Sequence, residues 1–461
     1  MSIDAYQDRY LPFLEAEMRA ALEAEGRTAP FYDMMRYHMG WLDANLDLLD
    51  WVEADVKQRN VEETGRKGMT IESVLRCAIL KQYRQLSYED LVFCLMDSTS
   101  CQTFARLPLG WFPQKPTLQS CISVISAVTW EEINQRLLKS AHKAKVERGD
   151  MLRIDSTVTE STIHAPSDST LLWDSVRVMV RMLGQAQELA GDQVKIAYHD
   201  HSRVAQKRTR AIHYTRGKAK KAQLYRDLIS ATHKTLGYLE AAAVSLNGVA
   251  QSDPMAGEIW RLQWKHYKPL ICQVIDQAER RVFQGETVPA TEKIVSIFEA
   301  HTDIIVKGAR EVQYGHKLNL STGRSGLILD VVIEDGNPAD SERFLPMLDR
   351  HIETYGKAPR QMAADGGYAS VENLREAKAA NVKDVAFHKK RGLKVEEMAK
   401  SPWVYRKLRN FRAGIEAGIS CMKRAYGLGR CTWKGLAHFK AYVWSSVVAH
   451  NLALFGRLLP A

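Results

Sequence analysis

The sequence lacks the signatures of several common protein classes. Its seven cysteines include no C-x-x-C pair and no zinc-ligand spacing, so we interpret them as reduced and mostly buried thiols. No stretch approaches the eighteen or more consecutive apolar residues of a membrane span, and the polar start has no signal-peptide core. The sequence also has no P-loop, no H-E-x-x-H and no G-x-S-x-G motif. We therefore expect a cytoplasmic protein with no membrane contact, no nucleotide cofactor, and no zinc-protease or serine-hydrolase chemistry.

Positive charge is in excess. The chain of 461 residues carries a formal net charge of +10, and 45% of its residues are hydrophobic, which is a globular composition. Its length predicts about three domains. A basic surface favours a polyanionic partner, of which nucleic acid is the commonest.

The first part of the chain, residues 1–148, has the apolar period of helices throughout. Thr70 is expected to cap one helix, Ser87 with Asp90 forms a capping box for the next, and Thr117 is expected to cap a further one. Two helices joined by a short turn suggest a helix-turn-helix. We predict a DNA-binding domain, a dimerisation domain, or both, and the sequence does not choose between them.

The pattern changes after this helical region. Residues 149–168 contain MLRIDSTV, a short β-branched run that predicts a buried strand ending near Asp155. Residues 169–290 are again helical, and we interpret them as a large insertion. Short apolar runs at 294–298 and 303–307 then predict strands, and the rest of 291–461 alternates strands with helices. One of those later strands ends at Asp365.

The helical insertion carries a run of one charge sign. Between Ser202 and Tyr225 there are eight basic residues and no acid, and such a run repels itself unless it meets a polyanion. We predict contact with the DNA backbone here; the alternative is a solvated helix face. The eight residues are Arg203, Lys207, Arg208, Arg210, Arg216, Lys218, Lys220 and Lys221.

A third acid, Glu416, stands alone in the basic stretch VYRKLRNFRAGIEAGISCMKR. Arg412 lies four residues before it and Lys423 seven after, so all three share one stripe of a helix. A surface ion pair between Arg412 and Glu416 would explain that spacing as well. We predict instead that Arg412 and Lys423 face DNA phosphates. The preceding loop supplies three more candidates for DNA contact: Lys389, Lys390 and Arg391.

The order of elements resembles an RNase H-like α/β core, a mixed sheet interrupted by the helical insertion and preceded by the helical domain. Asp155, Asp365 and Glu416 would converge at one edge of that sheet. Carboxylates are the ligands that Mg²⁺ prefers, and three of them can hold two ions about 3.5 to 4 Å apart for phosphoryl transfer. Asp155 would bridge both ions, and each of the other two acids would complete the coordination shell of one.

Four longer stretches carry a family resemblance: RIDSTVTESTIHAPSDSTLLWD, DGNPAD, AADGGYAS and NFRAGIEAGISCMKRAYGLGRCTW. They resemble transposases of bacterial insertion sequences with an Asp-Asp-Glu triad, and most of all the ISNCY group. Related transposases carry Y-x2-R-x3-E-x6-K on the catalytic helix. Arg412, Glu416 and Lys423 match the last three positions of that pattern, whereas Arg409 stands at its tyrosine position.

The resemblance implies two Mg²⁺ or Mn²⁺ ions, with Asp155, Asp365 and Glu416 as both the catalytic residues and the metal ligands. It further implies recognition of terminal inverted repeats in double-stranded DNA, strand cleavage that leaves a 3′-hydroxyl, strand transfer into target DNA, and at least a homodimer. Two alternatives stay open: a nuclease on the same fold that cuts without joining, and a domesticated DNA-binding protein without catalysis.

Overall fold

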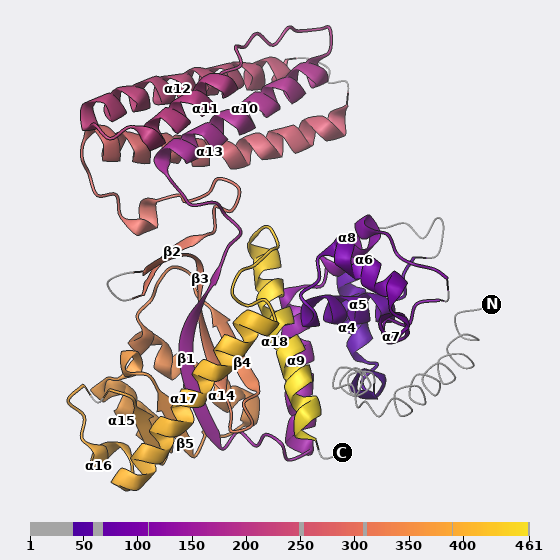
Figure 1. The fold of residues 1–461 in the computed structure, drawn as a ribbon, viewed down its shortest axis with the longest axis vertical. Coiled ribbons are helices and arrows are strands. Elements are labelled where there is room, and N and C mark those ends of the chain that lie inside the picture. The colour runs from indigo at the N-terminus through magenta and orange to yellow at the C-terminus, as the bar shows by residue number, and fades with distance from the viewer. Residues whose placement is uncertain are drawn as a thin grey trace. The chain divides into compact units, whose positions relative to one another are not determined.

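The computed structural model describes residues 40–58, 68–108, 110–248, 253–307, 311–389 and 391–459. The chain divides into two compact units. One unit combines Met1–Glu160 with His316–Ala461, and the other is Ser161–Gly315. Figure 1 shows the elements of both. No helix in the described ranges is both long enough and apolar enough to cross a membrane.

A mixed sheet forms the centre of the first unit. Strand β1 (Met151–Glu160) runs parallel to β5 (Gln361–Ala364), and β5 runs parallel to β6 (Asp384–Phe387). On the other side of β1 lies β3 (Glu311–Thr322), which pairs antiparallel with β4 (Ile328–Ile333). This arrangement of parallel and antiparallel strands is compatible with the predicted α/β core.

Helices surround the sheet. The connection from β4 to β5 contains η2 (Asp340–Arg343) and α14 (Phe344–Tyr355), and the connection from β5 to β6 contains η3 (Gly366–Tyr368) and α15 (Val371–Ala379). After β6 come α16 (Val395–Met398), α17 (Pro402–Ala425) and α18 (Leu436–Leu458). Helix α17 packs against β1, β5 and β6, while α18 packs against β4.

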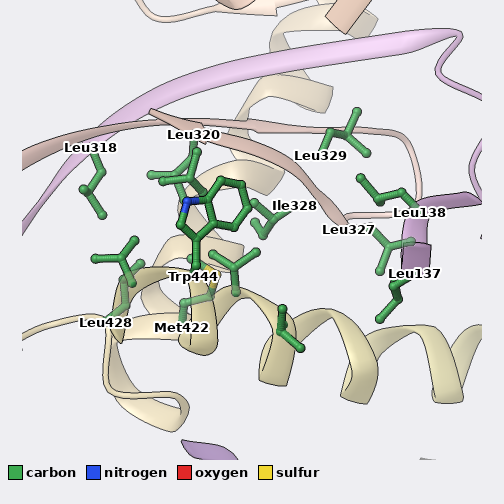
Figure 2. Close-up of a cluster of buried hydrophobic side chains, with 14 of the residues drawn as sticks. Leu137, Leu138, Leu318, Leu320, Leu327, Ile328, Leu329, Met422, Leu428 and Trp444 are labelled. Atoms are coloured by element: carbon green, nitrogen blue, oxygen red, sulfur yellow. The ribbon is translucent and has the colours of Figure 1, made fainter. Parts of the chain in front are cut away.

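The core of this unit joins α18 to the sheet. Figure 2 shows the indole of Trp444, on α18, beside Leu320 and Ile328 from β3 and β4. Trp444 is 4% exposed and both aliphatic side chains are fully buried. Truncating one such side chain to alanine typically costs about 2–5 kcal/mol of stability, so this cluster fixes the helix on the sheet.

The N-terminal part of the same unit is helical in its described residues. Its elements are α4 (Leu48–Lys57), α5 (Ile71–Tyr83), α6 (Tyr88–Asp97), α7 (Thr99–Phe104), α8 (Lys115–Ile122) and α9 (Ala127–Lys143). The Thr70 cap and the Ser87–Asp90 capping box are confirmed. The Thr117 cap is wrong, because α8 begins at Lys115 with Pro116 in its first turn and Gln114 at the cap position. Residues 1–39 of the predicted domain lie outside the described residues.

The second unit is a helical bundle with its own core. It contains α10 (Asp168–Ala190), α11 (Ser202–Tyr214), α12 (Lys218–Asn247) and α13 (Pro254–Phe283), which pack side by side (Figure 1). The short η1 (Ala290–Glu292) follows, and then β2 (Asp303–Lys307) pairs antiparallel with the beginning of β3.

The strand predicted at 294–298 is wrong. This segment has no regular structure, although Ile294 and Ile297 are buried in the helical core. The Gln277 side chain on α13 accepts a hydrogen bond from the Ile294 amide at 2.9 Å and donates one to the Ile294 carbonyl at 3.2 Å. A glutamine thus satisfies both backbone groups of Ile294, which a neighbouring strand would otherwise pair.

Candidate functional site

One predicted aspartate lies on β1, and the other directly follows β5, the neighbouring parallel strand. Ile154 of β1 is in register with Ala364, the last residue of β5. Asp155 and Asp365, the next residue of each segment, therefore lie side by side. Side chains in register on adjacent strands lie about 4.8 Å apart and point the same way. Asp155 is not at a strand end as predicted, because β1 continues to Glu160, where the Cys431 amide donates to the Glu160 carbonyl at 2.8 Å.

Helix α17 brings the third acid to the same place through Arg412. The guanidinium donates from Nη1 to Glu416 Oε1 at 2.5 Å and from Nη2 to Asp155 Oδ2 at 3.1 Å. The same Nη2 lies 3.6 Å from Asp365 Oδ1. The structure therefore gathers all three predicted acids, from two strands and one helix, around one arginine.

The acids differ in their contact with solvent. The side chains of Arg412 and Asp155 are 10% and 14% exposed, whereas those of Asp365 and Glu416 are 42% and 60% exposed. One oxygen of Asp155 also accepts a hydrogen bond from the Ser156 amide at 2.8 Å, which fixes the carboxylate. The cluster is thus anchored at Asp155 and opens to water at the other two carboxylates.

A purely oxygen donor set of this kind suits a hard cation such as Mg²⁺ or Mn²⁺. In the part of the chain that the structure describes, no group of three acidic, histidine or cysteine side chains is spaced to hold a metal ion. The Arg412 guanidinium lies within 3.6 Å of an oxygen of each of the three carboxylates. Carboxylates are the type of ligand that a divalent ion takes. Arg412 would have to release these three carboxylates before they could coordinate an ion.

A second arginine, which the sequence analysis did not identify, holds α17 on the sheet. Arg153 on β1 donates from Nε to Thr322 Oγ1 and from Nη1 to the Phe411 carbonyl, both at 2.6 Å. Its guanidinium also lies 4.6 Å from the centre of the Phe411 ring. A Cβ on Gly414 would come within 2.2 Å of Arg153 Nη1, so this glycine makes room for the arginine. Burial lowers the pKa of Arg153 to about 10. A charged residue in the apolar run MLRIDSTV was the signal that could have revealed it.

The two glycines after Asp365 also lie close to neighbouring residues. Neither has a positive φ, so turn geometry is not what selects them. A Cβ on Gly366 would lie 2.6 Å from the Lys389 Cβ, and one on Gly367 would lie 2.7 Å from a carboxylate oxygen of Asp340. These close approaches let the turn after β5 pack tightly beside the acids.

Tyr368 was also missed by the sequence analysis. This fully buried side chain donates its hydroxyl proton to Asn319 Oδ1 at 2.6 Å, and Asn319 donates in turn to Glu334 at 2.7 Å. Burial raises the pKa of Tyr368 well above its usual range, and the nearby charges of Asp340 and Asp155 act in the same direction. The tyrosine therefore stays protonated and links the turn after Asp365 to β3.

The remaining candidates for DNA contact on this unit are spread out. Lys389 and Arg391 are exposed in the loop after β6, and Lys390 lies outside the described residues. Lys423, near the end of α17, lines a cavity of about 820 Å³ that none of the three acids lines. The sequence placed Lys423 and Arg412 on one stripe, and Arg412 contacts the three acids.

The basic run lies in the second unit, on α11, in the turn after it and at the beginning of α12. Six of its eight side chains are exposed, and Arg208 and Lys221 are partly buried. Arg208 pairs with Asp227 on α12 at 3.0 Å, so part of its charge is already compensated within the bundle. The exposed members are Arg203, Lys207, Arg210, Arg216, Lys218 and Lys220.

Comparison with known proteins finds a match to a family model over part of the chain. Residues 302–452 match the family model of the transposase DDE domain. The match includes Asp365, Arg412, Glu416 and Lys423, and it begins after Asp155 and the helical bundle. It supports a DDE transposase family and, with it, a transposase function, DNA binding and the use of divalent metal ions, which is typical of that family. No curated protein and no solved structure matches the chain.

Proposed function

We propose that this protein is a transposase that cleaves DNA at the ends of its element and transfers the strands into target DNA. Asp155, Asp365 and Glu416 would hold two Mg²⁺ or Mn²⁺ ions. The observation that carries the proposal is that three acids, distant in sequence, meet at one guanidinium beside a parallel strand pair. The family match over residues 302–452 supports the same chemistry.

The chain's own groups suit this reaction. Two divalent ions, when bound, activate the attacking oxygen and stabilise the leaving oxygen during in-line displacement at a phosphodiester. The Ser156 amide orients Asp155, and Arg153 holds α17 so that Glu416 reaches the same edge of the sheet. Once released from the carboxylates, the Arg412 fork matches the geometry of a phosphate.

We further propose that the protein is a member of the ISNCY group. As part of the same proposal, it would recognise terminal inverted repeats and act as a homodimer that joins two ends. The exposed basic residues of α11 and α12, together with Lys389, Arg391 and Lys423, would contact the DNA backbone. Arg409, at the tyrosine position of the related motif, lies 6.0 Å from the Tyr405 ring, one turn earlier on α17. The Tyr405 hydroxyl donates to the Phe387 carbonyl at 2.8 Å, so this tyrosine serves to attach α17 to β6.

The test uses the full chain and a duplex made from the DNA that flanks its gene. With Mg²⁺ we expect nicks at the element ends and joined products with target DNA. Asp155→Asn and Glu416→Gln should each lower cleavage by roughly three orders of magnitude, since a lost metal ligand removes several kcal/mol of transition-state stabilisation. Both variants should still bind the duplex. Glu396→Gln, which changes an exposed acid on α16, is the matched control and should cleave normally.

Three outcomes would contradict parts of the proposal. Normal cleavage by Glu416→Gln would remove it from the site. Nicks without joined products would favour a nuclease on the same fold. DNA binding without any metal-dependent cleavage would favour a non-catalytic DNA-binding protein.

A further inference from the structure

A cavity of about 820 Å³ lies in the first unit, away from the three acids. Its walls come from the turn between α5 and α6, the beginning of α8, and the segment that joins α17 to α18. Cavities of roughly 300 to 1,000 Å³ are typical of sites for small organic ligands. This one is therefore large enough for a nucleotide and larger than a single ion needs.

The distinguishing residue of this cavity is Lys81 on α5. It is only 6% exposed, and its ammonium lies 4.7 Å from the centre of the Tyr88 ring and 5.7 Å from that of the Trp433 ring, both in the cavity wall. Among the residues described by the structure, no carboxylate lies within ion-pair distance of this ammonium, and no hydrogen-bond acceptor is assigned to it. The aromatic faces attract the ammonium, but they supply no hydrogen-bond acceptor.

An unpaired charge in such a place is costly. Burying an ammonium without a partner normally costs several kcal/mol, and proteins avoid it unless the charge is used. Burial lowers the pKa of Lys81 to about 8, which still leaves the ammonium protonated at neutral pH. A methionine would fill the same space without this cost, so the lysine is not explained by packing.

The rest of the cavity wall is rich in donors. The indole Nε1 of Trp433 is buried with no acceptor, and Lys423 and Arg430 add positive charge. The wall also contains three carboxylates of its own, Glu89, Asp90 and Glu160. Glu89 pairs with Lys115, and Asp90 closes the capping box of α6. The cavity therefore suits a ligand that brings several acceptor oxygens and negative charge.

We propose that this cavity binds a phosphate ester of a nucleotide, with the Lys81 ammonium as its buried contact. The phosphate belongs either to the backbone of a DNA strand or to a free nucleotide, and both present the same anionic oxygens. The site goes beyond the proposed strand chemistry, because none of the three acids lines it. Lys81 can be tested without touching Asp155, Asp365 or Glu416.

The experiment compares the full-length protein with Lys81→Met, using dAMP and a duplex DNA as separate probes in titration calorimetry. We expect Lys81→Met to be at least as stable as the parent, because it removes an unpaired buried charge. We also expect it to bind at least one probe ten-fold more weakly or worse. Weaker dAMP binding identifies a free-nucleotide site, and weaker duplex binding with no dAMP binding identifies a backbone phosphate. Lys57→Met, an exposed lysine on α4 outside the cavity, is the charge-matched control and should change neither affinity by more than two-fold.

Unchanged binding of both probes by Lys81→Met would overturn the proposal. A second measurement on the unmodified sequence guards against a variant that does not fold. Reductive methylation of Lys81, followed by mass spectrometry, should fall at least five-fold when the bound probe covers the ammonium. Equal methylation with and without both probes would also overturn it. Either negative result would leave the proposed cleavage by Asp155, Asp365 and Glu416 untouched, so the two proposals can be refuted separately.

Discussion

Helix α17 carries two glycines one turn apart, Gly414 and Gly418, on either side of Glu416. They face different surroundings. A Cβ on Gly414 would come within 2.2 Å of Arg153 Nη1, whereas a Cβ on Gly418 would meet nothing within 4 Å. In an exposed helix, replacing glycine by alanine stabilises the protein by about 1 kcal/mol. We expect that gain for Gly418→Ala and a net loss for Gly414→Ala.

The size of the loss follows from the contacts of Arg153. An unrestrained guanidinium would move away from a new methyl group at little cost. The Arg153 side chain is 8% exposed, however, and it donates hydrogen bonds to Thr322 and to the Phe411 carbonyl. Hydrogen bonds from a charged group are worth about 1.5–3 kcal/mol each. Losing both would cost about 3–6 kcal/mol. After the gain in helix propensity is subtracted, Gly414→Ala should be destabilised by about 2–5 kcal/mol.

Urea unfolding of both variants measures the difference directly. The double variant Arg153→Met with Gly414→Ala is informative as well, since the methyl group then meets a shorter, uncharged side chain. It should lose less than the sum of the two single changes. If Gly414→Ala proves as stable as the parent or more stable, Arg153 moves freely and does not hold α17 on the sheet.

Three further predictions concern charge. Arg412→Gln should destabilise the protein by about 2–3 kcal/mol in thermal unfolding without metal, since Asp155 loses its buried partner, and Mg²⁺ should restore more stability to this variant than to the parent. Replacing the exposed Arg210 and Lys220 by glutamine should make the salt dependence of DNA binding shallower by about 2 in log–log slope, whereas an unchanged slope would mean that they touch no phosphate. The pKa of Lys81 falls from 10.5 to about 8 on folding, so between these pH values the unfolded chain binds more protons than the folded one. The free energy of unfolding of the parent should therefore rise by about 3 kcal/mol over that pH range relative to Lys81→Met. Parallel pH profiles of the two proteins would contradict this.

The sequence was informative wherever a local pattern decides the structure. The caps at Thr70 and Ser87 depend on side chains within three residues of the helix start, and both are present. Asp365 follows its strand directly, as predicted, because β5 ends at Ala364 and the short helix η3 begins at Gly366. In each case the deciding interaction spans only a few residues of chain.

Features that depend on distant partners could not be read in this way. The extension of β1 beyond Asp155 is held by residues near Cys431, and the backbone of Ile294 pairs with the Gln277 side chain instead of with a strand. Gly414 is required by Arg153, which precedes it by more than 250 residues in the chain. A single sequence records these residues but not their pairing.

Arg412 shows how both kinds of information meet in one residue. Its spacing from Glu416 allowed a surface ion pair as the alternative to a phosphate contact, and that ion pair is present. A solvated ion pair of this type would contribute only a few tenths of a kcal/mol. The side chain is 10% exposed because two strands bring Asp155 and Asp365 against the same guanidinium. Three carboxylates this close repel one another, and the planar fork of arginine can satisfy them from two nitrogens at once, which the single ammonium of lysine cannot do. The surface pair suggested by the spacing is therefore the exposed end of a charge cluster that is buried at Arg412 and Asp155. Its buried end depends on the strands and not on the helix.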